Sequence, residues 1–222
     1  MVAEKIDQCM KPHGDEGIET INRMNENHAD ISEFAFECVN VEENDSILDI
    51  GCGGGVNIEK FLKLTSENVD GLDYSDISVA ESIKRNHKAV DLRKCKVIEA
   101  NVCDMPIDDE SYDLISAFET IYFWPDIENT FKEVLRILKP KGQFMIAQGT
   151  DGNHPDDELW LNTVEGMSLY TAPELEKYLL DAGFSNVKVF KKENDYILVV
   201  IAEKIAINHH RLFEPNESHH HH

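Results

Sequence analysis

A glycine-rich turn directly after a short apolar stretch is the feature that most restricts the fold of this chain. Residues 46–50 are predicted as a buried strand carrying Asp49 near its end, and residues 51–55 read Gly-Cys-Gly-Gly-Gly. Glycines let a chain turn sharply and leave no Cβ between the backbone and a ligand. Because residues 56–64 have helical apolar spacing, the segment is predicted as strand, turn and helix, the first unit of a parallel α/β sheet.

The rest of the chain repeats this alternation of strands and helices. Further strands are predicted at 69–73, 96–100, 112–118, 143–148, 187–190 and 196–201, and further helices at 78–90, 128–138, 156–164 and 172–182. The short polar stretch between the last two strands is hairpin-like and implies one antiparallel strand. We therefore expect an α/β fold with a Rossmann-like, doubly wound, seven-stranded and mostly parallel sheet, with helices on both faces. Such sheets bind ligands beyond the carboxyl ends of their strands.

One main domain is expected, with a shorter segment at each end. The 222 residues are 41% hydrophobic and 29% charged, which suits a single folded core. Residues 1–45 are predicted as a helical cap or lid, 46–205 as the ligand-binding domain with an insert at 149–170, and 206–222 as a tail ending in a partial histidine tag. The sequence shows no apolar run of membrane-spanning length and no signal peptide, so a cytoplasmic protein is expected.

The net charge and the spacing of the cysteines restrict which macromolecules and metal ions the chain is expected to bind. The chain has 21 Lys and Arg against 43 Asp and Glu, a net charge of −22, which would repel a phosphate backbone. We therefore expect no nucleic-acid partner. The acidic surface could attract a basic protein or a cationic small molecule, or it could serve solubility alone. The five cysteines lack metal-ligand spacing, so no metal site is predicted.

The second strand supports a ligand that contains a ribose. Asp73 ends that strand, 22 residues after Gly51, where a ribose diol would need an acceptor, although an acid here can also cap a helix or lie solvated in a loop. The third glycine of a dinucleotide fingerprint would stand at position 56, which is Val56. This departure disfavours a nicotinamide-dependent oxidoreductase, which stays open as an alternative.

Five stretches, in order, resemble motifs of the class I S-adenosylmethionine-dependent methyltransferases of the small-molecule type, the methyltransferase domain 11-like group. They span roughly residues 46–204: Leu48–Gly55, Gly71–Ser75, Asn101–Pro106, Ser111–Ile115 and Glu133–Gly142. The resemblance implies S-adenosylmethionine as cofactor, S-adenosylhomocysteine as product, and an insert at 149–170 that shapes the acceptor pocket. It implies a cofactor site made of Asp49, Gly51, Cys52, Gly53, Asp73, Tyr74, Asn101, Val102, Asp104, Met105 and Phe118.

Carried over to this chain, the resemblance also implies individual roles. The turn at Gly51 and Gly53 would lie against the methionine part and Asp49 would orient its amino group, while Asp73 would accept from both ribose hydroxyls. In the adenine loop, Asp104 would accept from the amino group, with turn formation as its alternative role, and the amide of Met105 would face a ring nitrogen. Tyr74 and Met105 would flank the ring or simply pack, and the carbonyl of Phe118 would face the ammonium group.

Methyl transfer asks little of the protein beyond alignment and exclusion of water, because the sulfonium already activates the methyl group. If the acceptor must lose a proton, the candidates lie where the acceptor is expected: Glu119, Tyr122, Trp124, His28 and Tyr170. Of these, Glu119, Tyr122 and His28 are predicted as catalytic residues. The aromatic stretch 118–125 suits a pocket wall and a core equally, and His28 is also readable as a surface histidine.

Taken together, the sequence predicts a methyltransferase that acts on a small molecule by in-line displacement. Residues 118–121 lack the motif of amino-methylating nucleic-acid enzymes, and no Pro-Cys pair for cytosine methylation occurs. A non-catalytic protein that binds the same cofactor remains an alternative, because catalysis without a base leaves no obligatory residue to look for. The acceptor atom and the oligomeric state do not follow from the sequence.

Overall fold

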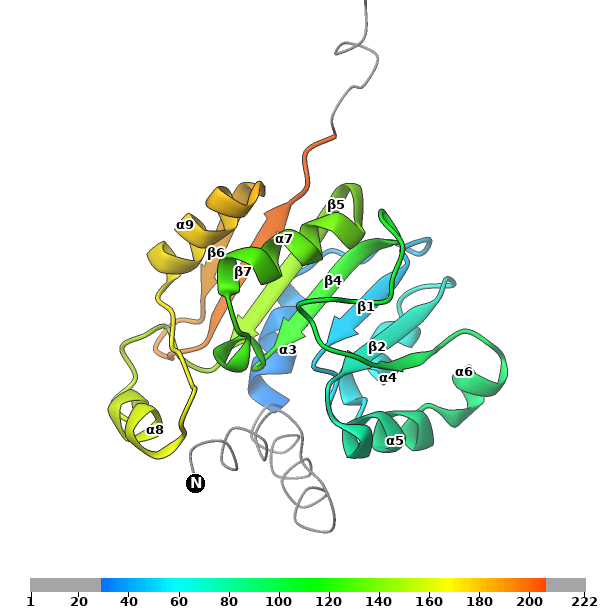
Figure 1. Ribbon diagram of the computed structural model, residues 1–222, viewed down its shortest axis with the longest axis horizontal. Coiled ribbons are helices and arrows are strands. Elements are labelled where there is room, and N and C mark those ends of the chain that lie inside the picture. Colours follow the sequence, from blue (N-terminus) through cyan, green and yellow to red (C-terminus); the bar gives the residue numbers. More distant parts are fainter. Residues whose placement is uncertain (1–28, 207–222) are drawn as a thin grey trace, which may run out of the picture.

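The computed structural model describes residues 29–206, and a seven-stranded sheet with the order β3-β2-β1-β4-β5-β7-β6 runs through them (Figure 1). The strands are β1 (Ile47–Ile50), β2 (Val69–Asp73), β3 (Val97–Glu99), β4 (Tyr112–Phe118), β5 (Leu138–Gln148), β6 (Ser185–Lys191) and β7 (Leu198–Glu203). The first five strands pair in parallel, whereas β7 runs antiparallel to both β5 and β6. The predicted Rossmann-like sheet with one antiparallel strand is confirmed.

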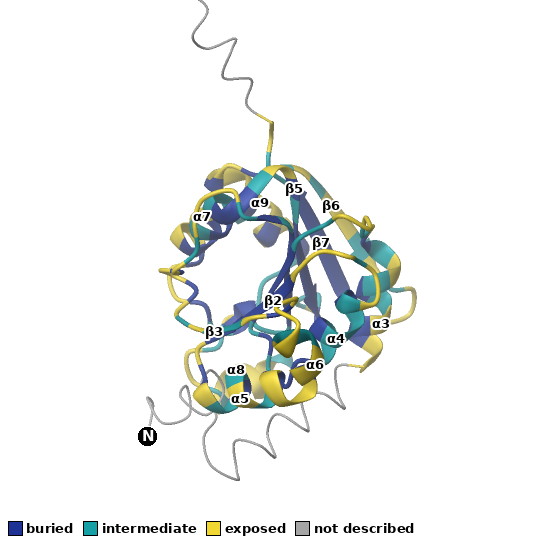
Figure 2. Cartoon of the chain, turned by 90° about the vertical axis from the view of Figure 1, so that its right-hand side faces the viewer, coloured by how far each residue is buried: buried dark blue, intermediate teal, exposed yellow. Residues whose placement is uncertain are grey.

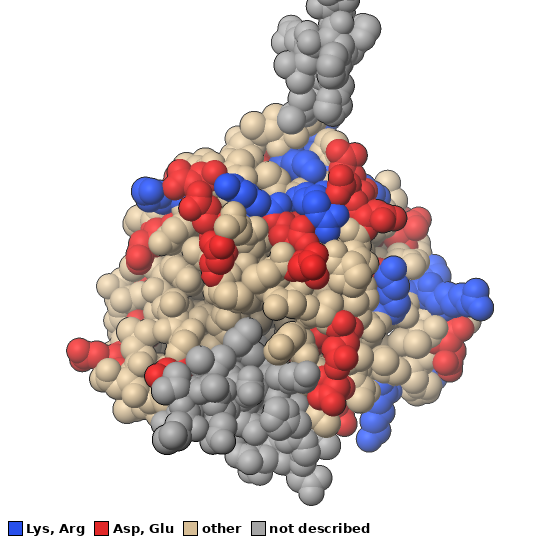
Figure 3. Space-filling model, in the orientation of Figure 1, with Lys and Arg blue, Asp and Glu red and all other residues tan. Residues whose placement is uncertain are grey.

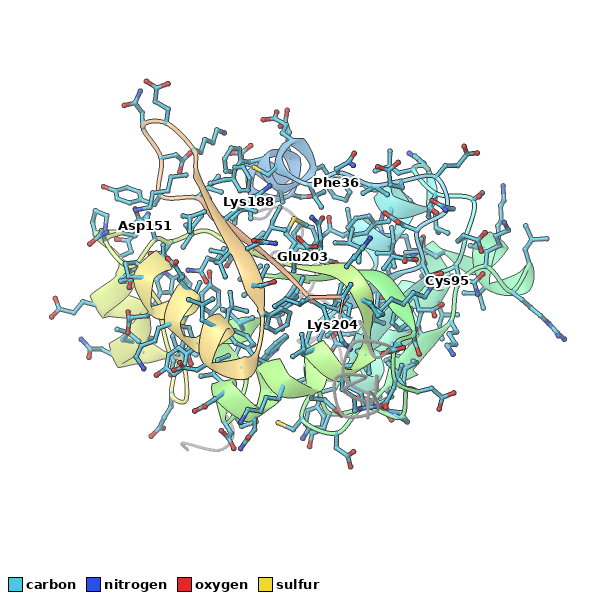
Figure 4. The ribbon with its side chains drawn as sticks, turned by 90° about the horizontal axis from the view of Figure 1, so that it is seen from above. Phe36, Cys95, Asp151, Lys188, Glu203 and Lys204 are labelled. Atoms are coloured by element: carbon cyan, nitrogen blue, oxygen red, sulfur yellow. The ribbon has the colours of Figure 1, made fainter. Side chains whose placement is uncertain are left out.

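Helices cover both faces of this sheet. They are α3 (Ala29–Cys38), α4 (Val56–Leu62), α5 (Asp76–Arg85), α6 (His87–Asp91), the single 3-10 turn η1 (Ile121–Phe123), α7 (Ile127–Ile137), α8 (Asp157–Thr163) and α9 (Ala172–Ala182). Figure 4 shows α3, with Phe36, on one side of the sheet and α7 and α9 on the other. Each side has its own apolar core, so the central strands β1, β2 and β4 are buried on both faces, whereas the edge strands β3 and β6 are partly exposed.

Helix ends follow from identifiable side chains. The Thr171 hydroxyl accepts from the Glu174 backbone N–H while the Glu174 carboxylate accepts from the Thr171 N–H, a capping box that starts α9. Gly183, at a φ of 112°, ends the same helix in the left-handed conformation. At the end of α7, Lys204 Nζ donates to the carbonyls of Leu135 and Leu138 at 2.9 and 2.8 Å, which satisfies groups the helix cannot pair internally.

Two elements differ from the prediction by more than two residues. The helix expected at 78–90 is two helices, because the Asn86 side-chain amide donates to the carbonyls of Gly55 and Ser82 and α5 ends there. Strand β5 begins at Leu138 rather than at residue 143. The expected turn at 139–142 is a bulge within the strand, where Lys141 has a φ of 69° and the register to β4 shifts.

The strand order of the sheet reverses between β1 and β4. From β1 the chain adds β2 and β3 on one side, then crosses back to place β4 on the other side. Strand order therefore reverses at β1 and β4, whose carboxyl ends point to the lower end of the molecule in Figure 1. Ligands of open α/β sheets bind at such a point. None of the helices within residues 29–206 is long and apolar enough to cross a membrane.

Candidate functional site

Hydrogen bonds from the side chains of Ser82 in α5 and of Asn86 at its C-terminal end fix the glycine turn after β1. Gly51, Gly53 and Gly55 all have positive φ, at 72°, 52° and 84°. Ser82 Oγ donates to the carbonyl of Gly53 at 2.7 Å, and Asn86 Nδ2 donates to the carbonyl of Gly55 at 3.0 Å. These two bonds hold the carbonyls of the turn toward α5.

The three glycines serve different purposes. A Cβ on Gly53 would meet nothing within 4 Å, so this position faces open space. A Cβ on Gly51 would lie 2.3 Å from Thr120 Oγ1, and one on Gly55 would lie 2.9 Å from the Ser82 Cα. Gly53 therefore gives a ligand access to the backbone, whereas Gly51 and Gly55 allow the turn to approach β4 and α5.

Asp73 lies beside this turn, as predicted. Its Oδ2 accepts from the Gly53 N–H at 3.0 Å and its Oδ1 accepts from the Ser75 N–H at 2.9 Å. Burial raises the pKa of Asp73 to about 6, and these backbone hydrogen bonds partly oppose the rise. Each carboxylate oxygen has two lone pairs, so a fixed carboxylate held this way still has capacity for a diol.

Asp49 and Cys52 lie deeper under the turn. Asp49 is buried, and its Oδ1 accepts from the Ser116 hydroxyl of β4 at 2.8 Å. Burial, with the nearby charge of Asp73 as a smaller cause, raises the pKa of Asp49 to about 7. The Cys52 thiol is 3.3 Å from the Ser82 hydroxyl, and burial raises its pKa well above the usual value, so it stays protonated.

The loop expected to contact adenine is built differently from the prediction. The Met105 N–H donates to Glu133 Oε2 at 2.7 Å, and the Met105 side chain is in the core. The expected contact between this amide and a ring nitrogen stays a prediction; in this structure the amide donates to a carboxylate of α7 instead. Asp104 is exposed, and the Asn101 side chain accepts from the Cys103 N–H at 2.9 Å. Asn101, Val102 and Asp104 remain the candidate adenine contacts of this loop, and Tyr74, at 42% exposure, is placed to flank a ring.

A second polar pair lies where β4 ends. Tyr122 in η1 donates its hydroxyl to Glu119 Oε1 at 2.8 Å, and the Gly149 N–H, at the end of β5, donates to the same oxygen. Glu119 is partly buried and has a φ of 53°, and burial raises its pKa to about 7. A carboxyl group with that pKa exchanges protons at neutral pH. The structure thus brings together two of the three predicted catalytic residues; His28 lies outside the described residues.

The aromatic stretch that follows β4 is mostly core. Phe118 is 5.9 Å, centroid to centroid, from Phe36 of α3, and Trp124 stacks on Phe144 at 6.2 Å. Both side chains are buried, which decides against a pocket wall at these two positions. Tyr170 is partly buried, and its carbonyl accepts from the Gln148 amide.

Four residues with a part in the site were missing from the prediction: Ser82, Asn86, Thr120 and Glu133. Ser78, Ser82 and Asn86 recur at helical spacing on a buried face, which signals polar contacts made by that face. Glu133 stands three residues before Arg136, whose Nε donates to it at 2.6 Å, and this spacing is typical of a helical ion pair. No sequence pattern points to Thr120, because its role depends on its proximity to Gly51 in the folded chain.

The site fits the cofactor that the resemblance implies. The open position over Gly53 suits the approach of a ligand to backbone, and the fixed carboxylate of Asp73 suits a ribose. Asp49, Asp73 and Glu119 are all acids, which favour a ligand with sulfonium and ammonium charges over an anion.

Comparison with known proteins agrees with this geometry. Residues 48–146 match the family model described as "Methyltransferase domain". The sterol 24-C-methyltransferase erg6 of Aspergillus fumigatus is 28% identical over 121 residues, which is 52% of this chain and 32% of that protein. The 24-methylenesterol C-methyltransferase 2 of Arabidopsis thaliana is 27% identical over 150 residues, 66% of this chain and 42% of that protein. The chain thus spans less than half the length of these relatives.

Solved structures share the fold. Geranyl diphosphate C-methyltransferase of Streptomyces coelicolor A3(2), solved with S-adenosylhomocysteine, is 14% identical with a TM-score of 0.70, and the match covers 89% of this chain and 87% of that one. A SAM-dependent methyltransferase of Aquifex aeolicus is 20% identical with a TM-score of 0.70, covering 85% and 98%. Residues 48–146 thus match a methyltransferase domain, and the chain has the fold of solved S-adenosylmethionine-dependent methyltransferases.

Proposed function

We propose that this protein transfers a methyl group from S-adenosylmethionine to a small-molecule acceptor by direct in-line displacement. The observation that carries the proposal is the pairing of the glycine turn with the Asp73 carboxylate, through the 3.0 Å bond from Gly53. The bound cofactor supplies an electrophilic methyl group, so the chain has mainly to bind, align and exclude water.

The cofactor side of the site is assigned to the turns after β1, β2 and β3. Asp73 accepts from the ribose hydroxyls, and Gly53 brings backbone against the methionine part. Asp49 orients the amino group from below, and Phe118 contributes its carbonyl. Asn101 and Val102 bind the adenine edge, and Tyr74 covers the ring. Charge-assisted bonds of this kind contribute about 1–3 kcal/mol each.

The acceptor side is assigned to the carboxyl ends of β4 and β5. Glu119 takes the proton of the acceptor, and Tyr122 holds that carboxylate in place through its 2.8 Å bond. The pKa of about 7 supports this role, since the group is ionised in part at neutral pH and can accept a proton. The acids around the site favour a neutral or cationic acceptor over an anionic one.

Calorimetric titration tests the proposal. S-adenosylmethionine and S-adenosylhomocysteine are titrated into the full chain, with a nicotinamide dinucleotide as the parallel ligand. We expect micromolar binding of the two adenosyl ligands and none of the dinucleotide. Tight dinucleotide binding would favour the oxidoreductase alternative, and a folded sample that binds neither adenosyl ligand would reject the proposal.

Binding must then be separated from turnover. The protein is incubated with S-adenosylmethionine and fractions of a small-molecule extract, and S-adenosylhomocysteine release is followed by mass spectrometry. Release that depends on one fraction supports methyl transfer. Cofactor binding with no release from any fraction supports the non-catalytic alternative.

A further inference from the structure

Helix α8 is an apolar helix without a core to pack on. Leu159, Trp160 and Leu161 are consecutive and 64%, 52% and 46% exposed, and α8 contains no buried residue. These side chains contrast with the central strands of the sheet, which Figure 2 shows largely in the colour of buried residues. A seven-residue helix is marginal without packing, and large apolar side chains gathered on a surface mark a binding site.

Hydrogen bonds attach the insert that carries α8 to the acceptor side of the site. The Ser168 N–H donates to the carbonyl of Tyr122 at 2.8 Å, and the Thr150 hydroxyl donates to Asp157 Oδ2 at 2.8 Å. Helix α8 therefore begins beside the segment that follows β5, and the chain beyond α8 returns at Ser168 to the segment that follows β4. It lies at the same lower end of the molecule to which β1 and β4 point (Figure 1).

An unsatisfied acceptor lies at the base of the same insert. Gln148 is fully buried at the end of β5, and its Nε2 donates to the carbonyls of Thr150 and Tyr170 at 2.8 and 2.9 Å. These bonds fix the orientation of the amide, so Oε1 must accept. Among residues 29–206, Oε1 of Gln148 is the one buried side-chain nitrogen or oxygen found without a partner. A buried acceptor of this kind calls for an O–H or N–H donor.

The acidic residues around α8 restrict the kind of molecule that can bind to its apolar side chains. Asp156, Asp157 and Glu158 precede the apolar triplet, and Glu165 follows it. On the face shown in Figure 3, Lys and Arg lie along the upper part and the right side, whereas the lower-left region, where α8 lies in Figure 1, shows acidic and uncharged atoms. A second copy of this helix or an anionic membrane would bring like charges together. A neutral or cationic occupant meets no such repulsion.

We propose that α8 binds the apolar body of the methyl acceptor, and that this acceptor is a neutral or cationic amphiphile with at least one O–H or N–H group. Leu159, Trp160 and Leu161 contact its hydrocarbon part, and Gln148 Oε1 accepts from its polar group. This inference rests on the proposed function, since it gives that function its substrate class. A compact polar acceptor and an anionic one are both excluded by it.

Tryptophan fluorescence tests the inference. The full chain, saturated with S-adenosylhomocysteine, is titrated with 1-decanol, decylammonium and decyl phosphate, each kept below its solubility limit or micelle concentration. The difference between the native chain and Trp160→Phe isolates the emission of Trp160 from that of Trp124. We expect decanol and decylammonium to shift the Trp160 emission to shorter wavelength, and decyl phosphate to bind at least about tenfold more weakly.

A matched pair of variants separates this site from general detergent binding. Leu159→Ser combined with Leu161→Ser should weaken decanol binding by about tenfold or more. Leu92→Ser, at a position 75% exposed just after α6, should leave it unchanged. Both should keep the S-adenosylhomocysteine affinity of the native chain; absence of that affinity in the native chain would instead count against the proposed function.

Several results would overturn the inference. Decyl phosphate could bind as tightly as decanol, or the double serine variant could bind like the native chain. A Trp160 emission that is already at short wavelength and insensitive to the probes would show that the chain covers α8 by itself. A native dimer that the double serine variant dissociates would show that a second copy covers it.

Discussion

Gly53 donates its backbone N–H to Asp73 Oδ2 at 3.0 Å, and this bond joins the turn after β1 to the turn after β2. The two strands are in register, with Ile50 opposite Leu72, so their turns emerge side by side. The position of the carboxylate is thereby coupled to the conformation of the glycine turn. A change in either residue should alter cofactor binding through the other.

Replacing Asp73 tests the ribose assignment. Asp73→Ala should weaken S-adenosylmethionine binding by about ten- to a hundredfold, because charge-assisted hydrogen bonds to two hydroxyls are lost. Asp73→Asn keeps one acceptor oxygen, so its affinity for S-adenosylmethionine should lie between those of the native chain and Asp73→Ala. Calorimetry gives the affinities, and a melting curve shows that each variant is folded. A folded alanine variant with native affinity would disprove the assignment.

Two glycine substitutions should separate binding from folding. Gly53→Ala places a methyl group in open space at a φ of 52°, so it should cost about 1–2 kcal/mol of stability and weaken cofactor binding by at least about tenfold. Gly51→Ala adds a clash at 2.3 Å from Thr120 Oγ1 and should lose more stability than Gly53→Ala. Urea unfolding and calorimetry measure the two effects. Equal stability losses, or native affinity in Gly53→Ala, would contradict the roles given to these glycines.

Local patterns predicted the elements whose causes are local. The bounds of β2, β4 and α9 agree with the prediction, because apolar runs and the Thr171 and Gly183 caps lie within or next to those segments. The position of Asp73 beside the glycine turn was also predictable. Parallel neighbours in a βαβ unit place consecutive strand-to-helix turns at one edge of the sheet.

Contacts between distant residues could not be predicted in this way. The Met105 amide is bound by Glu133, on a helix that a sequence pattern does not orient toward the adenine loop. The break between α5 and α6 depends on an Asn86 bond to Gly55, across the turn from its own helix. The bulge at 139–142 is defined by pairing with β4. Each of these features requires the three-dimensional arrangement.

Stability should depend on pH through Asp49. Its folded-state pKa is raised to about 7 by burial, so the folded state binds the proton more tightly than the unfolded state does. The stabilisation is complete below the unfolded pKa of about 4 and is lost as the pH rises through about 7. Asp49→Asn removes this dependence and keeps an oxygen that can accept from Ser116. Relative to the native chain, the variant should gain at least about 1 kcal/mol between pH 5 and pH 8.

Denaturant unfolding at several pH values measures this difference. Asp91→Asn serves as the control, since Asp91 is exposed at the end of α6 and should show no comparable gain. A native chain and an Asp49→Asn variant with parallel stability curves would show that Asp49 stays ionised in the folded state.

Methyl transfer should follow the ionisation of Glu119. Because its pKa is raised to about 7 by burial, the rate at saturating cofactor should rise through about pH 7 and level off above it, as the carboxylate becomes free to accept a proton. Glu119→Gln should lower the rate by about 10²–10⁴-fold and flatten the profile. Tyr122→Phe removes a donor that lowers this pKa, so its profile should move to higher pH while cofactor affinity stays native. A Glu119→Gln variant with the native rate and profile would show that the acceptor loses its proton without this base.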